Sequence, residues 1–126
     1  MKIEVSNGEI LDKLNILYLK ARFITDEDKL VNVRKEIDEL QPIGQDLFKK
    51  YGAELINLYT ELCSINKELW RIEDQIRSYE KKKDFGELFI EHARAVYITN
   101  DRRSDCKKRI NILTESGLIE EKSYED

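Results

Sequence analysis

The chain has 126 residues and combines 38% charged with 40% hydrophobic residues, with only 5 Gly and 1 Pro. The length fits one domain that buries a core without disulfides or metal, and the composition is typical of long amphipathic helices. Both argue against a sheet-rich fold and predict an all-α bundle over residues 1–126. The net charge of -4 gives the whole molecule no attraction for polyanions, so nucleic acid is not a predicted partner.

The two cysteines, Cys63 and Cys106, are isolated, and the chain has a single histidine, His92. This leaves no spacing that suits zinc, so we predict neither a metal nor a cofactor. No apolar run is long enough to span a bilayer, and the amino end lacks the apolar stretch of a signal peptide. We therefore expect a cytoplasmic protein with reduced thiols and no membrane partner.

The first predicted helix begins after Ser6. Ser6 and Glu9 have the spacing of a capping box, and Val5 and Ile10 occupy the positions of a hydrophobic staple. The apolar stripe that follows is wide, as in a helix that packs against two others. Its members are Ile10, Leu11, Leu14, Leu17, Tyr18, Ala21 and Ile24.

A second helix is predicted from about Asp26, where carboxylates gather at a candidate N-terminus. Its stripe consists of Leu30, Val33, Ile37 and Leu40. The helix is expected to weaken at Leu40 and Gln41, because a residue before proline is disfavoured in the α region, and Pro42 follows. Residues 42–52 fit either a short separate helix or the start of the next long one, and the sequence leaves both open.

The clearest pattern in the chain is an apolar seam with alternating steps of three and four residues, which predicts a long helix over about 53–81. The seam consists of Leu55, Leu58, Leu62, Ile65, Leu69, Ile72, Ile76 and Tyr79. A second seam of the same rhythm predicts a last helix, with Asp84 as N-cap and a turn over 80–83. It consists of Phe85, Phe89, His92, Val96, Thr99, Arg103, Cys106, Ile110 and Leu113. The two helices are expected to form an antiparallel hairpin.

In this hairpin the numbers of facing residues sum to about 164 or 165, which sets Ile72 opposite His92 and Leu62 opposite Arg103. A buried arginine is costly unless it is paired, so Arg103 is expected to contact Glu61 or a carboxylate of the first or second helix. His92 is expected to contact Glu73. Beyond the hairpin, Gly117 fits a helix-ending glycine, and a polar tail begins at about residue 118.

A candidate anion site surrounds Arg103, because a guanidinium fork matches the oxygens of a phosphate or carboxylate. The alternative interpretation is structural: the polar residues of this seam fix the helix register, or the helix kinks near residues 99–101. The candidate ligand-binding residues are Arg94, Asn100, Asp101 and Arg103, with Glu9 and Asp12.

Two pairs of carboxylates, Glu9 with Asp12 and Glu36 with Glu39, have the spacing that can bind Mg²⁺ on one helix face. This spacing resembles the metal sites of all-α nucleotide pyrophosphohydrolases. In that family a Glu-x-x-Glu pair precedes a Glu-x-x-Asp pair, whereas here the Glu-x-x-Asp pair comes first. We therefore assign no metal ligands.

Three stretches together resemble an uncharacterised family of small helical proteins found in bacteria and tailed phages. They are IEVSNGEILDKL at 3–14, ELWRIEDQIR at 68–77 and ARAVYITNDRR at 93–103. The resemblance spans most of the chain and implies a compact stand-alone helical protein. That family has no assigned reaction or ligand, so it transfers no site residue.

The leading functional hypothesis is a non-enzymatic interaction or scaffolding module that forms a homo-oligomer or binds another protein. Helices this long and regular usually carry more apolar stripe than one short chain covers. The alternative is a small enzyme or binding protein for a phosphorylated metabolite or nucleotide, which uses the Arg/Asn/Asp cluster of the last helix. The sequence does not decide whether the protein is an enzyme.

Overall fold

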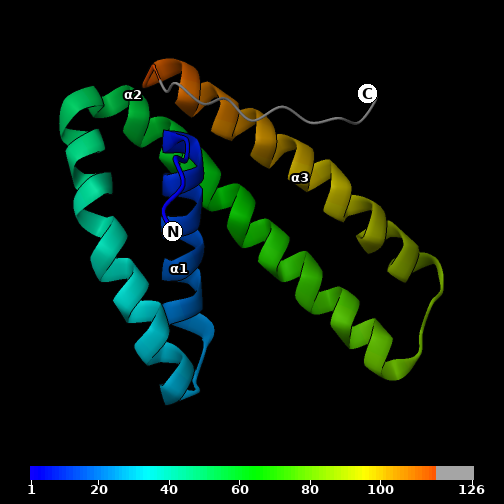
Figure 1. Cartoon of the computed structure of the whole chain (residues 1–126). Coiled ribbons are helices and arrows are strands. Elements are labelled where there is room, and N and C mark those ends of the chain that lie inside the picture. The colour runs from blue at the N-terminus through cyan, green and yellow to red at the C-terminus, as the bar shows by residue number, and fades with distance from the viewer. Residues whose placement is uncertain (116–126) are drawn as a thin grey trace.

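The computed structural model describes residues 1–115, and three helices account for most of them (Figure 1). They are α1 (Asn7–Phe23), α2 (Glu27–Lys82) and α3 (Glu87–Leu113). No strand occurs within residues 1–115, which confirms the predicted all-α class. Gly117 and the predicted polar tail lie outside the described residues.

Both predicted helix starts are confirmed by their caps. The Ser6 hydroxyl accepts a hydrogen bond from the Glu9 backbone N–H (3.2 Å) at the start of α1. At the start of α2, the Asp26 carboxylate accepts from the backbone N–H groups of Asp28 (3.0 Å) and Lys29 (3.4 Å). These side chains satisfy backbone donors that the first helical turn leaves without partners.

The interruption in α2 lies at Gly52, not at Leu40 and Gln41 as predicted. Helical structure runs through Pro42, whereas Gly52 has φ 63° and ψ -141°, a conformation that only glycine adopts without strain. Residues 42–51 therefore complete the predicted second helix, and neither of the two alternatives for them was right. Packing explains the continuity, because a Cβ built on Gly44 would lie 2.9 Å from Leu14 of α1.

The C-terminal part of α2, residues 53–82, forms the predicted antiparallel hairpin with α3. At the end far from the turn, the Cys106 thiol donates to the Leu58 carbonyl (3.3 Å) and the Tyr51 hydroxyl donates to the Thr114 carbonyl (3.0 Å), close to the predicted register. Toward the turn, contacts shift further along α2, and His92 packs edge-on against Tyr79, with ring centroids 5.4 Å apart, rather than opposite Ile72.

The shift has a local cause in the loop between α2 and α3. Helix α2 extends to Lys82, and Lys83 ends it in the left-handed conformation, so the loop occupies residues 83–86. Asp84 was predicted as the N-cap, but Gly86 holds that position and Asp84 Oδ1 accepts from the Gly86 N–H (3.2 Å). From there α3 runs without a break through residues 99–101 and ends at Leu113.

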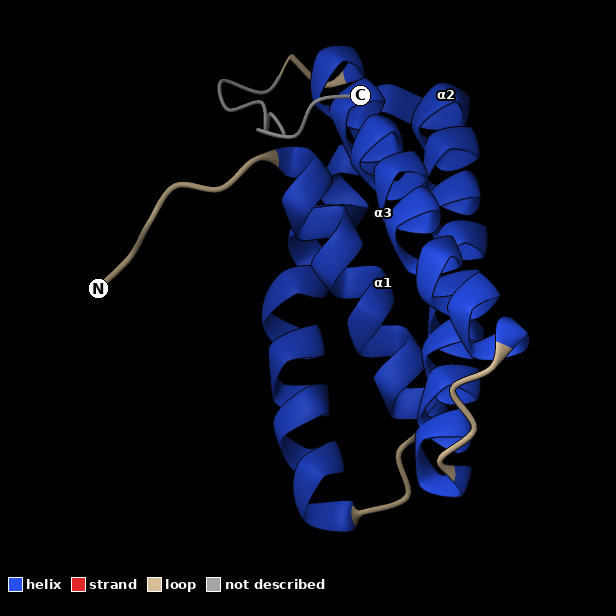
Figure 2. Ribbon diagram, turned by 90° about the vertical axis from the view of Figure 1, so that its right-hand side faces the viewer, coloured by secondary structure: helices blue, strands red, loops and turns tan. Residues whose placement is uncertain are grey.

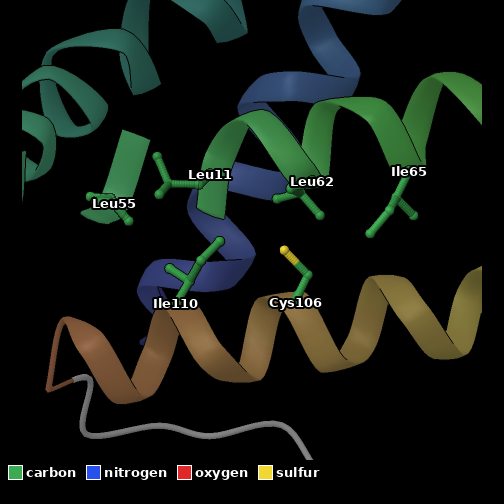
Figure 3. Close-up of a cluster of buried hydrophobic side chains, with 6 residues drawn as sticks. All are labelled: Leu11, Leu55, Leu62, Ile65, Cys106 and Ile110. Atoms are coloured by element: carbon green, nitrogen blue, oxygen red, sulfur yellow. The ribbon is translucent and has the colours of Figure 1, made fainter. Parts of the chain in front are cut away.

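Helix α1 lies between the N-terminal part of α2 and the α2–α3 hairpin, and both views show this arrangement (Figures 1 and 2). The core forms where the three helices meet. Figure 3 shows its most buried side chains gathered from all three: Leu11, Leu55, Leu62, Ile65, Cys106 and Ile110. The predicted wide stripe of α1 is accounted for by this position between two neighbours.

Candidate functional site

A buried carboxylate, Asp12, lies at the centre of a polar cluster between the helices. Asp12 is 1% exposed and accepts two hydrogen bonds from the Arg103 guanidinium, from Nε to Oδ1 (3.0 Å) and from a terminal nitrogen to Oδ2 (2.5 Å). Asn66 Nδ2 donates to Asp12 Oδ1 (2.9 Å), and Lys107 Nζ lies 3.8 Å from Oδ2. The partner of Arg103 is thus a carboxylate of the first helix, one of the two predicted alternatives; the other, Glu61, contacts Arg109 (2.6 Å).

The cluster continues on both sides of Asp12. Asn66 Nδ2 also donates to Asn15 Oδ1 (2.9 Å), and Asn15 Nδ2 lies 2.9 Å from the Cys63 sulfur. On the other side, Lys107 Nζ contacts Glu9 Oε2 (2.7 Å). A buried charge is tolerated when cations and donors surround it in this way.

A ladder of polar contacts ties the N-terminal turns of α1 to the C-terminal turns of α3. Besides Asp12 with Arg103 and Glu9 with Lys107, the Gly8 N–H donates to Asn111 Oδ1 (2.7 Å) and Asn7 Nδ2 donates to Thr114 Oγ1 (2.9 Å). Glycine permits this approach, because a Cβ at position 8 would lie 2.6 Å from the Lys107 carbonyl oxygen. We call these four contacts the α1–α3 ladder.

The structure brings together only some of the predicted ligand-binding residues. Arg103, Asp12 and Glu9 belong to the ladder, whereas Arg94 and Asp101 are exposed and Asn100 is half-buried. Arg94 lies nine residues before Arg103, which is about 13 Å along a helix. Asp101 lies two residues before Arg103, on a different face of α3. A reaction or ligand that uses all six residues stays a prediction.

Three of the four carboxylates considered for magnesium, all except Glu39, have cations as partners. Glu9 contacts Lys107, Asp12 contacts Arg103, and Glu36 lies 3.3 Å from Lys13. Among residues 1–115, no group of three or more His, Cys, Asp or Glu side chains is arranged to hold a metal ion.

The histidine and the cysteines have structural surroundings. His92 Nδ1 lies 2.7 Å from the Leu88 carbonyl oxygen, so the expected contact with Glu73 is replaced by a bond within α3. Burial raises the pKa of Cys106 to about 11, and burial likewise raises the pKa of Cys63. Raised values keep both groups in the weakly nucleophilic thiol form at neutral pH, so neither environment activates a thiolate.

Next to the polar cluster is a pocket of about 320 Å³, which we call the junction pocket. It lies where all three helices meet, and Asn66 and Arg103 connect it to the cluster. Its other lining residues are Ile16, Leu19, Lys20, Leu69, Trp70, Glu73, Asp74 and Arg77.

Sequence reasoning missed Asn15, Asn66 and Lys107 as members of the cluster. All three are less than 10% exposed. A signal was available: each is a polar residue directly beside an apolar residue of a stripe, with Asn15 after Leu14, Asn66 after Ile65 and Lys107 after Cys106. Such positions flank the core-facing line of a helix and are buried when the helix packs on two sides.

Fold and site together define an all-α protein whose helices are joined by buried polar contacts. The whole chain, residues 1–126, matches the model of a family described as a family of unknown function (DUF6165), and it belongs to that family. Among curated proteins and among solved structures, none matches the chain. Within the described residues, no helix has the length and apolar character needed to cross a membrane.

Proposed function

We propose that the chain is a non-enzymatic helical interaction module that self-associates through the tip of the α2–α3 hairpin, residues 78–93. The observation that carries this proposal is the exposure of large apolar side chains at the tip. Phe85, Leu88 and Ile90 are 51%, 54% and 54% exposed. In Figure 1 the tip projects away from α1 and from the N-terminal part of α2.

The helical seam near the tip is only half covered. Tyr79, Phe89 and His92 are of intermediate burial, whereas Leu62 and Ile65 of the same hairpin are buried under α1. The Phe85 and Phe89 rings pack edge to face, with centroids 5.2 Å apart, so the exposed and half-buried rings adjoin. Apolar groups that adjoin on a surface are typical of interaction sites, whereas single exposed ones are not.

A second copy of the chain is the partner we propose, because the tip carries both signs of charge on different helices. The lysine run 81–83 ends α2, and Glu87 and Glu91 lie at the start of α3. A twofold arrangement can set the basic part of one tip against the acidic part of the other. The tip is smaller than the roughly 20–30 residues a side of a stable interface, so we expect weak association.

The first prediction tests this module by light scattering coupled to size-exclusion chromatography. The average mass of the wild-type protein is expected to rise with concentration. Leu88→Gln keeps a good helix former but removes apolar surface at the tip, so it is expected to shift association to higher concentration by roughly tenfold.

Val31→Gln is the matched control. Val31 is 59% exposed but lies on the N-terminal part of α2, so this variant is expected to associate like the wild type. A wild-type mass that stays monomeric at every concentration contradicts the proposal, as does equal weakening by both variants.

The proposed setting is the cytoplasm, which is supported by Cys63 and Cys106 both being free thiols.

A further inference from the structure

We propose that the junction pocket binds a small zwitterion, a molecule with an ammonium group and an oxyanion such as a carboxylate or phosphate. None of the residues that line the pocket belongs to the hairpin tip, residues 78–93, so this inference does not depend on self-association. Its volume of about 320 Å³ falls at the lower end of the range for small-molecule sites. A ligand of this size touches all three helices.

The floor of the pocket contains an amide with an unused acceptor. Asn66 is 4% exposed, and its Nδ2 donates to two oxygens, Asp12 Oδ1 and Asn15 Oδ1. These bonds fix the orientation of the amide, because the reverse orientation would set its carbonyl oxygen against two acceptors. The Asn66 Oδ1 atom therefore has no hydrogen-bond partner among the described residues.

An unpartnered buried acceptor is unusual in folded proteins and favours a ligand that brings a donor. An ammonium N–H is such a donor. Two carboxylates of α2, Glu73 and Asp74, also line the pocket and attract a positive charge to it. Asn66 and the two carboxylates thus favour the same ligand group, an ammonium.

The cationic side chains of the pocket favour the other group of the ligand, its oxyanion. Lys20 of α1 and Arg77 of α2 line the pocket, and neither forms an ion pair with any residue in the range 1–115. Glu73 and Arg77, four residues apart on α2, likewise form no ion pair with each other within that range, so both signs of charge are presented to a ligand. The Arg103 charge, by contrast, is offset by Asp12.

A ligand with one sign of charge fits this pocket poorly. An anion is attracted by Lys20 and Arg77 but repelled by the carboxylates of Glu73 and Asp74. A cation is attracted by the two carboxylates but repelled by Lys20 and Arg77. A zwitterion makes both attractions. The apolar side chains of Leu19 and Leu69, together with the Trp70 ring, leave room for an apolar part of the ligand.

Trp70 is the single tryptophan of the chain, and its ring stacks on Phe23 with centroids 5.5 Å apart. Trp70 also lines the junction pocket, so its fluorescence is expected to report occupancy. We would titrate the full-length protein with each standard L-amino acid and with O-phosphoethanolamine, which separate carboxylate from phosphate ligands. A saturable change is expected for at least one of them, with a matching rise in melting temperature.

Two analogues of the best amino acid test the charges: its amide, which lacks the carboxylate, and its deaminated acid, which lacks the ammonium. Each is expected to bind at least roughly tenfold more weakly, because each leaves one charged side of the pocket without a partner. If O-phosphoethanolamine binds best, ethanolamine and ethyl phosphate replace these analogues. An analogue with one charge that binds as well as the zwitterion overturns the proposal.

Arg77→Gln and Glu73→Gln are expected to weaken binding by roughly tenfold each. Arg71→Gln is the control, because Arg71 lies on the same helix and lines a neighbouring groove beside Trp70 instead. All three residues are exposed, so the variants are expected to melt like the wild type. Binding by no zwitterion, or equal weakening by Arg71→Gln and Arg77→Gln, overturns the assignment to this pocket.

Discussion

Asp12 and Arg103 stabilise the protein as a pair, and neither does so alone. Asp12 is 1% exposed and the Arg103 side chain 25% exposed, so removal of one partner leaves a charge in surroundings that exclude most water. The neighbouring pair of Arg102 and Glu68 has side chains that are 53% and 39% exposed. The ion pairs of the two adjacent arginines of α3 are therefore expected to contribute very different amounts to the free energy of unfolding.

Arg103→Met is expected to lower the free energy of unfolding by about 3 kcal/mol, because Asp12 then lacks its bidentate partner. Arg102→Met, the same change one residue earlier, is expected to cost less than about 1 kcal/mol, because water screens that pair. Urea unfolding followed by circular dichroism measures both. Similar losses of unfolding free energy in the two variants would contradict the conclusion that the buried Asp12 depends on Arg103 as its partner.

Cys106 makes stability depend on pH in the alkaline range. Its pKa rises from the ordinary 9.0 to about 11 in the folded protein because of burial. The unfolded chain thus loses this proton at lower pH than the folded one, so the free energy of unfolding is expected to fall as pH rises from about 9 to about 11. Urea unfolding at several pH values measures the slope, which Cys106→Ala is expected to reduce. An unchanged slope in that variant would exclude Cys106 as its source.

At the scale of the helices, the sequence predicted most of what local rules determine. The caps at Ser6 and Asp26 and the seam of α2 follow from spacing and from side-chain chemistry alone. The position of the break in α2 does not. Pro42 removes one backbone hydrogen bond, but packing against α1 outweighs that loss, whereas Gly52 allows a backbone conformation that lets the chain change direction.

Gly52→Ala is expected to lower the free energy of unfolding by about 1–3 kcal/mol. No atom lies within 4 Å of a Cβ built there, so the cost comes from the backbone conformation and not from a clash. Gly86→Ala is the matched control, since Gly86 has a negative φ of -76° and the one close neighbour of a Cβ built there, Asp84 Oδ1 at 3.3 Å, belongs to an exposed side chain that can shift. Thermal and urea unfolding of both variants measure the difference in stability. A Gly52→Ala variant as stable as the wild type would contradict the prediction, because it would show that the break tolerates a side chain.

At the scale of the whole molecule, the sequence predicted the hairpin but not what surrounds Asp12. The cluster depends on how α1 is rotated and placed against two other helices, and the apolar stripe of α1 leaves that freedom open. Arg103 was recognised because it interrupts a seam. Asn66 and Lys107 do not interrupt one, so their burial follows only from packing on a second side.

The α1–α3 ladder joins residues that are far apart in the chain, separated by 91 positions between Asp12 and Arg103 and by 107 between Asn7 and Thr114. The contacts of α1 with the N-terminal part of α2, and of the C-terminal part of α2 with α3, form within two helical hairpins, between neighbouring segments. Local contacts of this kind form early, because they close short loops, so the ladder is expected to form last.

The ladder should then determine how long the native state lasts more than how fast it is reached. Stopped-flow kinetics of Arg103→Met are expected to show faster unfolding with a nearly unchanged refolding rate. Slower refolding would mean instead that the two ends of the helical region meet in the rate-limiting step. In the expected outcome, the lifetime of the folded chain is governed by a few polar contacts between its first and last turns of helix.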